Sequence, residues 1–143
     1  MSKVTLRAGK LFSAILVVAG ALGALAIVLA KPPVRGPHHH PEPRVGQADL
    51  GAAVMPASFF PASSRPAQAY QFAREIPSTL DGIYCYCVCS EALGHVSLLQ
   101  CFESQHGAGC DVCMKEAEVA YQMNRDGRTL SEIRTTIDAT FGS

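Results

Sequence analysis

The residues in this chain best suited to chemistry are its six cysteines, which all lie in a short stretch of the sequence. Three alternate with other residues, one stands alone, and two form a Cys-x-x-Cys pair: Cys85, Cys87, Cys89, Cys101, Cys110 and Cys113. Cysteines scattered through a core would not gather in this way. The pattern therefore indicates thiols that act on one another or on a shared ligand.

A thiolate metal site is one chemistry that this spacing favours. Soft sulfur selects Cu(I) and Zn(II) over hard cations, and the Met114 thioether after the Cys-x-x-Cys pair would add a bias toward Cu(I). Cys110 stands where a helix is predicted to begin, and a helix N-terminus stabilises thiolate. His95 and His106 flank Cys101 and could complete a mixed sulfur–nitrogen site. They are also explained as a polar helix residue and a turn residue.

A disulfide framework is the alternative, because an even number of cysteines in an exported domain is typical of structural disulfides. Cys-x-Cys spacing is too short for an unstrained disulfide within the motif, so each sulfur needs a distant partner or a shared metal. The Cys110–Cys113 pair has redox spacing but no βαβ pattern around it. Met114 follows the pair instead of histidine, which excludes c-type haem attachment. Metal binding and disulfides both remain open.

Charge divides the chain into two unlike halves. Residues 1–75 carry a net +5 and residues 76–143 a net −5. An acidic cysteine-rich half argues against nucleic-acid binding, which needs a basic face, and is compatible with attracting cations. No catalytic triad, paired-carboxylate motif, phosphate loop or HExxH motif is present. We therefore predict a protein that is not an enzyme.

The N-terminal region, residues 1–30, predicts a membrane anchor. Residues 11–30 form an uncharged apolar stretch that would reach about 30 Å as a helix, the thickness of a bilayer core. Lys3, Arg7 and Lys10 precede it, so the positive-inside rule places the following residues outside the cytoplasm. The alternative is a cleaved signal peptide that leaves a secreted protein. Both interpretations place the cysteines outside the cytoplasm.

Residues 31–66 are predicted to form a disordered linker. This stretch contains eight of the nine prolines, which fix φ and lack a backbone donor. His38, His39 and His40 lie within it. Three adjacent imidazoles can capture a metal ion weakly, although a polar run in a tether explains them equally well.

Residues 67–143 predict a small, mainly α-helical, cysteine-rich domain. Helices are expected over residues 67–75, from about 91 to 102 after a Ser90 N-cap, from about 110 to 125, and after residue 129. Residues 84–89 alternate as in a strand, although so short a run fits a loop or tight turn equally well. So small a domain needs disulfides or a metal to supplement its core.

The last predicted helix carries the clearest structural signal. Thr129 and Glu132 form a capping box. Its apolar residues recur at helical spacing and must face a core: Leu130, Ile133, Ile137 and Phe141.

The cysteine-rich sequence resembles the bacterial family named for its PCYCGC motif. The resemblance rests on residues 84–89 (YCYCVC), Gly94-His95, Cys101-Phe102, residues 106–110 (HGAGC) and Cys113, and extends over about residues 76–141. The chain has Tyr84 where the family has proline and Val88 where it has glycine. Members of that uncharacterised family are similar in being exported or membrane-attached. The resemblance implies that both histidines and the six cysteines form one constellation.

These features together predict a metal-binding protein of the bacterial cell envelope. The expected ligands are the six cysteines with His95 and His106, and the expected cargo is Cu(I), with Zn(II) as a second candidate. The protein would capture, store or transfer the ion while attached to the membrane. The alternative is a disulfide-stapled, membrane-tethered interaction module that binds no metal.

Overall fold

The computed structural model describes residues 39–44 and 49–142. These residues form a mainly helical domain, and no β-strand occurs among them. The apolar segment 11–30, predicted to be a transmembrane helix, lies outside the described residues. Within the described ranges, no helix combines the length and apolar character needed to cross a membrane.

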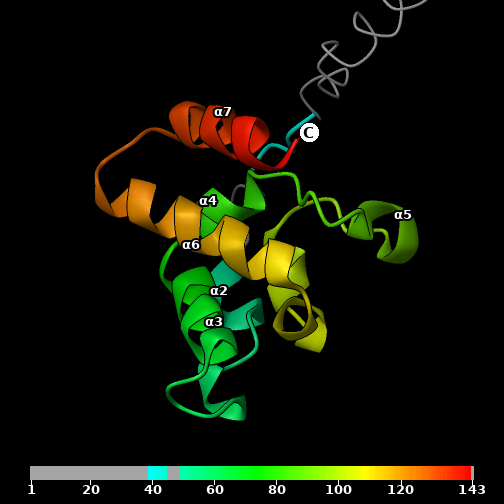
Figure 1. The fold of residues 1–143 in the computed structure, drawn as a ribbon, viewed down its shortest axis with the longest axis vertical. Coiled ribbons are helices and arrows are strands. Elements are labelled where there is room, and N and C mark those ends of the chain that lie inside the picture. Colours follow the sequence, from blue (N-terminus) through cyan, green and yellow to red (C-terminus); the bar gives the residue numbers. More distant parts are fainter. Residues whose placement is uncertain (1–38, 45–48, 143) are drawn as a thin grey trace, which may run out of the picture. The chain divides into compact units, whose positions relative to one another are not determined.

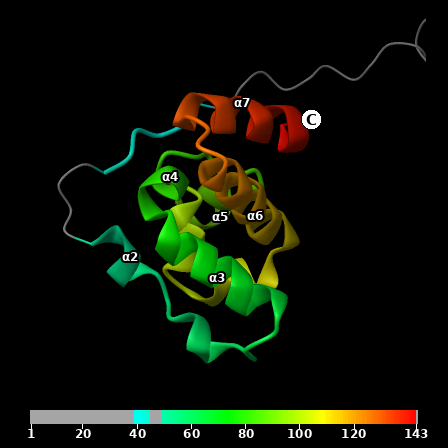
Figure 2. The ribbon, with the colours of Figure 1, turned by 90° about the vertical axis from the view of Figure 1, so that its left-hand side faces the viewer.

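Helix α6 (Asp111–Arg125) lies between α3 (Arg65–Glu75) and α7 (Leu130–Phe141), as Figures 1 and 2 show. The remaining elements are shorter. They are α2 (Leu50–Ala53), η1 (Ala57–Phe59), α4 (Pro77–Asp81), α5 (Cys89–Leu93), η2 (Leu99–Phe102) and η3 (Gln105–Gly109), where η denotes a 3-10 helix.

Helices α3 and α6 confirm two predictions made from the sequence. The Ser64 hydroxyl caps α3, which ends before Pro77 as expected because the residue ahead of a proline avoids the helical region. Helix α6 ends at Arg125, and Gly127 follows with φ of 73°. The rings of Phe72 and Tyr121 stack between the two helices with centroids 4.1 Å apart.

Helix α7 also forms as predicted. Thr129 and Glu132 make both hydrogen bonds of the capping box. Ile133 and Ile137 are fully buried. Leu130 and Phe141, at the two ends of the stripe, are partly buried and pack against the same core.

The predicted disordered linker differs from the structure in both of its described parts, and most clearly from residue 49 onward. Leu50 and Val54 are buried in the domain core, and the centroids of the Phe60 and Tyr70 rings lie 4.6 Å apart. The Arg74 guanidinium donates to the Val54 carbonyl at 2.8 Å. Prolines prevented long helices here, but the apolar residues between them still pack. The helical domain therefore includes residues from 49 onward.

Residues 84–88 take the loop or turn that the sequence left open for this run, whereas residues 89–102 differ from the prediction. Residues 86 and 87 form a turn, and α5 begins at Cys89 with Val88, not Ser90, as its N-cap. Gly94 adopts φ of 72° and ends this helix after five residues, so the continuous helix expected to reach Phe102 does not form. A separate 3-10 helix, η2, carries Cys101. Helix α5 stands on an arm at one side of the domain (Figure 1).

A buried ion pair joins residues 39–44 to the helical domain. The Asp81 side chain is 2% exposed and accepts hydrogen bonds from the Arg44 backbone N–H at 2.6 Å, its guanidinium, and the Ser97 hydroxyl at 3.0 Å. Burial alone would raise the pKa of Asp81, but the hydrogen bonds from Arg44 and Ser97 outweigh it and lower the pKa below its ordinary value.

We expect Asp81→Asn to lower the free energy of unfolding at pH 7 by about 2 kcal/mol, because it removes charge-assisted hydrogen bonds. The folded-state pKa lies below the unfolded value, so this stabilisation is present above about pH 4 and is lost as pH falls through the folded pKa. Urea denaturation of wild type and variant should therefore converge in acid. The exposed Lys115–Glu118 pair supplies a control, since Glu118→Gln should cost about 0.5 kcal/mol or less. A difference that persists unchanged to pH 2 would contradict this account.

Candidate metal centre

The turn after α4 brings the first two cysteines into the domain interior. Ile83 is fully buried, and its carbonyl accepts a hydrogen bond from the Leu98 N–H at 2.7 Å. This contact anchors the chain just before Cys85, which is 3% exposed. The next cysteine, Cys87, is partly exposed.

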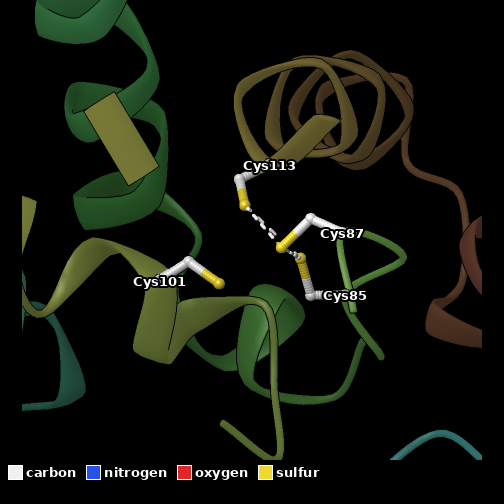
Figure 3. Close-up of side chains that lie close together, drawn as sticks. All are labelled: Cys85, Cys87, Cys101 and Cys113. Atoms are coloured by element: carbon white, nitrogen blue, oxygen red, sulfur yellow. Dashed lines mark hydrogen bonds between the residues drawn. The ribbon is translucent and has the colours of Figure 1, made fainter. Parts of the chain in front are cut away.

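Four cysteine sulfurs from three elements point toward one another (Figure 3). Cys85 and Cys87 come from the turn, Cys101 from η2 and Cys113 from the first turn of α6. The Sγ atom of Cys87 lies 3.4 Å from those of Cys85 and Cys113, and the latter two are 3.5 Å apart. Cys101 and Cys113 are fully buried.

The remaining predicted ligands extend this cluster in two directions. Cys89 Sγ lies 3.4 Å from Cys101 Sγ, and His95 Nδ1 lies 3.4 Å from the same sulfur. His106 Nε2 is 3.7 Å from Cys87 Sγ. The His95 and His106 rings meet edge to face with centroids 5.4 Å apart.

A glycine allows η3 to bring His106 close to the sulfurs. Gly107 is buried, and a Cβ at this position would lie 2.9 Å from the Cys101 carbonyl oxygen and 3.1 Å from the Phe102 ring. Any larger residue would separate η3 from η2. The close approach places His106 and Cys110 on the same side of the cluster as Cys87.

The ligand atoms form three overlapping sets of four, and within each set all atoms lie within 4.8 Å of one another. We call them the buried, middle and exposed sets. The buried set is Cys85, Cys87, Cys101 and Cys113; the middle set is Cys87, Cys89, Cys101 and His106; the exposed set is Cys87, His106, Cys110 and Cys113. Cys87 belongs to all three. The structure therefore brings all six cysteines and His106 together, whereas His95 contacts Cys101 and belongs to none of the sets.

The six cysteines are free thiols in this structure. Their nearest sulfur–sulfur distances of 3.4 to 3.5 Å exceed the length of a disulfide bond, about 2.05 Å. Cys85, Cys87 and Cys113 each have two sulfur neighbours at this distance. A disulfide pairs each sulfur with a single partner, so this convergence fits a shared ligand better than a set of exclusive pairs.

Burial and thiol–thiol contacts keep the innermost cysteines protonated. The hydrogen bond with Cys101 is the main cause that raises the pKa of Cys113, and burial adds to it. A hydrogen bond with Cys113 lowers the pKa of Cys101, but contacts with Cys85 and burial raise it above its ordinary value. A metal ion must displace these protons, so binding would release protons into solution.

Glu116 is a site residue that the sequence analysis missed. Its carboxylate is fully buried, accepts from the Tyr86 N–H at 2.9 Å and from the Cys85 thiol at 3.2 Å, and so orients the turn that carries the cysteines. Burial raises the pKa of Glu116 to about 7. The signal was its position three residues after Cys113, which places both side chains on the same face of α6.

Two other residues singled out in the sequence have surroundings of their own. Met114 lines a surface pocket with Phe72 and Glu118. In the histidine tract, His40 Nδ1 accepts from the Tyr84 N–H at 3.0 Å, and its Nε2 lies 2.8 Å from Asp138. Both ring nitrogens of His40 therefore have hydrogen-bond partners within the domain.

The spacing of the ligands fits a soft metal ion. A tetrahedral zinc site with Zn–S bonds of about 2.3 Å sets its sulfurs about 3.8 Å apart. The sulfurs of the buried set lie slightly closer where they touch and no farther apart than 4.8 Å. Small side-chain movements would therefore suffice to bind an ion.

The fold and the cluster define a class: a small α-helical domain built around several cysteine thiols and a histidine that could hold a metal. The chain belongs to the family described as "protein of unknown function with PCYCGC motif", whose model matches residues 37–143. No curated protein and no solved structure matches the chain. The family resemblance seen in the sequence is thus confirmed, and the match begins well before residue 76.

Proposed function

We propose that this protein binds soft metal ions, with Cu(I) as its main cargo, and captures, stores or transfers them by ligand exchange. The observation that supports this proposal is the convergence of six thiol sulfurs and His106 in three sets with shared members. One Zn(II) ion uses four ligands, and this cluster offers more sulfur than that. Cu(I) is satisfied by about two or three sulfurs, so shared thiolates suit several Cu(I) ions.

The proposed activity is binding and transfer without bond-making catalysis. We further propose that the domain works outside the cytoplasm of a bacterial cell. The apolar segment 11–30 and the basic residues before it support a membrane anchor, or a secreted form after cleavage. A thiol cluster with access to metal ions from outside the cell is compatible with the net charge of −5 over residues 76–143.

The first test is Cu(I) titration of the full-length chain, isolated from the membrane fraction in its reduced form and without a polyhistidine tag. We expect more than one Cu(I) per chain to stay bound in competition with a limiting amount of the chelator bathocuproine disulfonate, and the bound thiols to be protected from Ellman's reagent. Cys110→Ser/Cys113→Ser should lose well over half of this copper, because the double change disrupts the buried and exposed sets and leaves only the middle set.

Three outcomes would count against the proposal. Six oxidised thiols with no bound metal would support the disulfide-stapled module instead. Equal, weak binding by wild type and double variant would show that the cluster does not hold Cu(I). Recovery of the chain in the soluble cytosolic fraction would contradict the proposed location.

A further inference from the structure

We propose that metal ions enter and leave the cluster through the exposed set, by ligand exchange with a carrier that presents soft sulfur ligands. This inference rests on the proposed function and assigns a direction to it. The exposed set would exchange ions with the carrier, and the buried set would retain them.

The burial of the ligands differs systematically among the three sets. In the buried set, only Cys87 is partly exposed, and Cys85, Cys101 and Cys113 are buried. The middle set has two partly exposed members. In the exposed set, three of the four ligands are partly exposed and only Cys113 is buried. An incoming sulfur ligand can therefore reach an ion in the exposed set more easily than in the other two.

Two shared cysteines connect the exposed set to the buried set. Cys87 and Cys113 belong to both, and their sulfurs lie 3.4 Å apart. An ion can move inward while it keeps its bonds to these two thiolates. It exchanges a bond to Cys110 for a bond to Cys85 or Cys101, and the proton displaced from that thiol passes to the Cys110 thiolate. The ion is therefore never released into water during the transfer.

The exchange with the carrier is balanced in bonds, charge and protons. Cu(I) arrives bound to a carrier thiolate, forms a bond to the Cys110 sulfur, and then loses its bond to the carrier. Protons displaced from the Cys110, Cys87 and Cys113 thiols pass into solvent, and one of them returns to the departing carrier thiolate. Copper remains Cu(I) throughout, so no oxidant or reductant takes part. A thiolate or thioether carrier is the matching chemical class because these ligands select Cu(I).

Each set contains one cysteine that occurs in no other set, which allows a matched test. Cys110 is unique to the exposed set and Cys85 to the buried set. The Cys110 sulfur also caps α6 by accepting from the Cys113 N–H at 3.4 Å. Serine is among the preferred N-cap residues, so Cys110→Ser should keep the helix start while it removes the soft ligand.

The experiment uses the full-length chain loaded with Cu(I) and mixed rapidly with excess bathocuproine disulfonate, which forms a coloured Cu(I) complex. Both Cys110→Ser and Cys85→Ser should bind less Cu(I) than wild type. Only Cys110→Ser should slow the release of the remaining copper, by about tenfold. A modest increase in the activation free energy of release produces a change of this size. Release from Cys85→Ser should be as fast as from wild type or faster.

The results separate failure of this inference from failure of the proposed function. If Cys110→Ser releases copper at the wild-type rate, or if Cys85→Ser slows release equally, exchange does not proceed through the exposed set. If wild type cannot be loaded with Cu(I) at all, the proposed function fails at the loading step, and the exchange proposal fails with it.

Discussion

Cys87→Ser should weaken Cu(I) binding more than any other single cysteine change in the protein. Cys87 is the one ligand common to the buried, middle and exposed sets, so its loss leaves no set with four members. Serine retains the size of the side chain but replaces a soft sulfur with a hard oxygen. We expect the affinity to fall by more than about 100-fold. Changing a group that only supports a ligand already lowers metal affinity by up to about 100-fold, and Cys87 is itself a proposed ligand.

The matched control is Cys89→Ser, two residues along the chain at the start of α5. Cys89 belongs to the middle set alone, so this variant keeps the buried and exposed sets intact. Competition titrations against a Cu(I) chelator should place Cys89→Ser close to wild type and Cys87→Ser far below it. Equal losses in the two variants would show that the sulfurs act independently, without a shared centre.

Thermal stability gives a second measurement of the same prediction. A ligand that binds only the folded state raises the melting temperature according to its affinity and concentration. Cu(I) should therefore stabilise wild type and Cys89→Ser, and have little effect on Cys87→Ser. A copper-dependent rise in melting temperature that survives in Cys87→Ser would contradict its central position in the cluster.

The sequence predicted the helices with strong local signals and missed those without them. Helix α7 has a capping box and a regular apolar stripe, and both appear in the structure. The region around α5 has no such periodicity. Val88 there adopts φ of 63°, a left-handed conformation that is strained for a β-branched residue, and this turns the chain into α5 two residues earlier than expected. The family motif, which has glycine at this position, held the clue.

The members of the cysteine cluster were predictable from the sequence, but their arrangement was not. Cysteine spacing identified the thiols, and the family resemblance grouped them with the histidines. Which sulfurs meet depends on how η2, η3 and α6 pack, and this depends on contacts distant in sequence, such as Gly107 against the Cys101 carbonyl. The buried carboxylate of Glu116 was missed because acidic residues on helices are normally solvated.

Tertiary contacts also connect α7 to the turn that carries Cys85 and Cys87. The Tyr86 hydroxyl donates to Asp138 on α7, and Tyr86 lies between the two cysteines of the turn. On the same helix, the Arg134 guanidinium donates to the Gly82 carbonyl at 2.8 Å. Helix α7 therefore holds the turn from one side, although it contributes no ligand to any of the three sets.

We accordingly expect Ile133→Asp to destroy both the fold and the metal centre. Ile133 is fully buried in the core, and an aspartate there would place an unpaired charge among apolar side chains. The cost, about 4 kcal/mol or more, approaches the whole stability of a small domain. Circular dichroism should show a largely unfolded chain at 25 °C, and all six thiols should react rapidly with Ellman's reagent.

The control is Thr135→Asp, which adds the same charge at an exposed position of α7. It should melt within a few degrees of wild type and keep its buried thiols protected. A folded Ile133→Asp variant with protected thiols would show that α7 does not support the cluster.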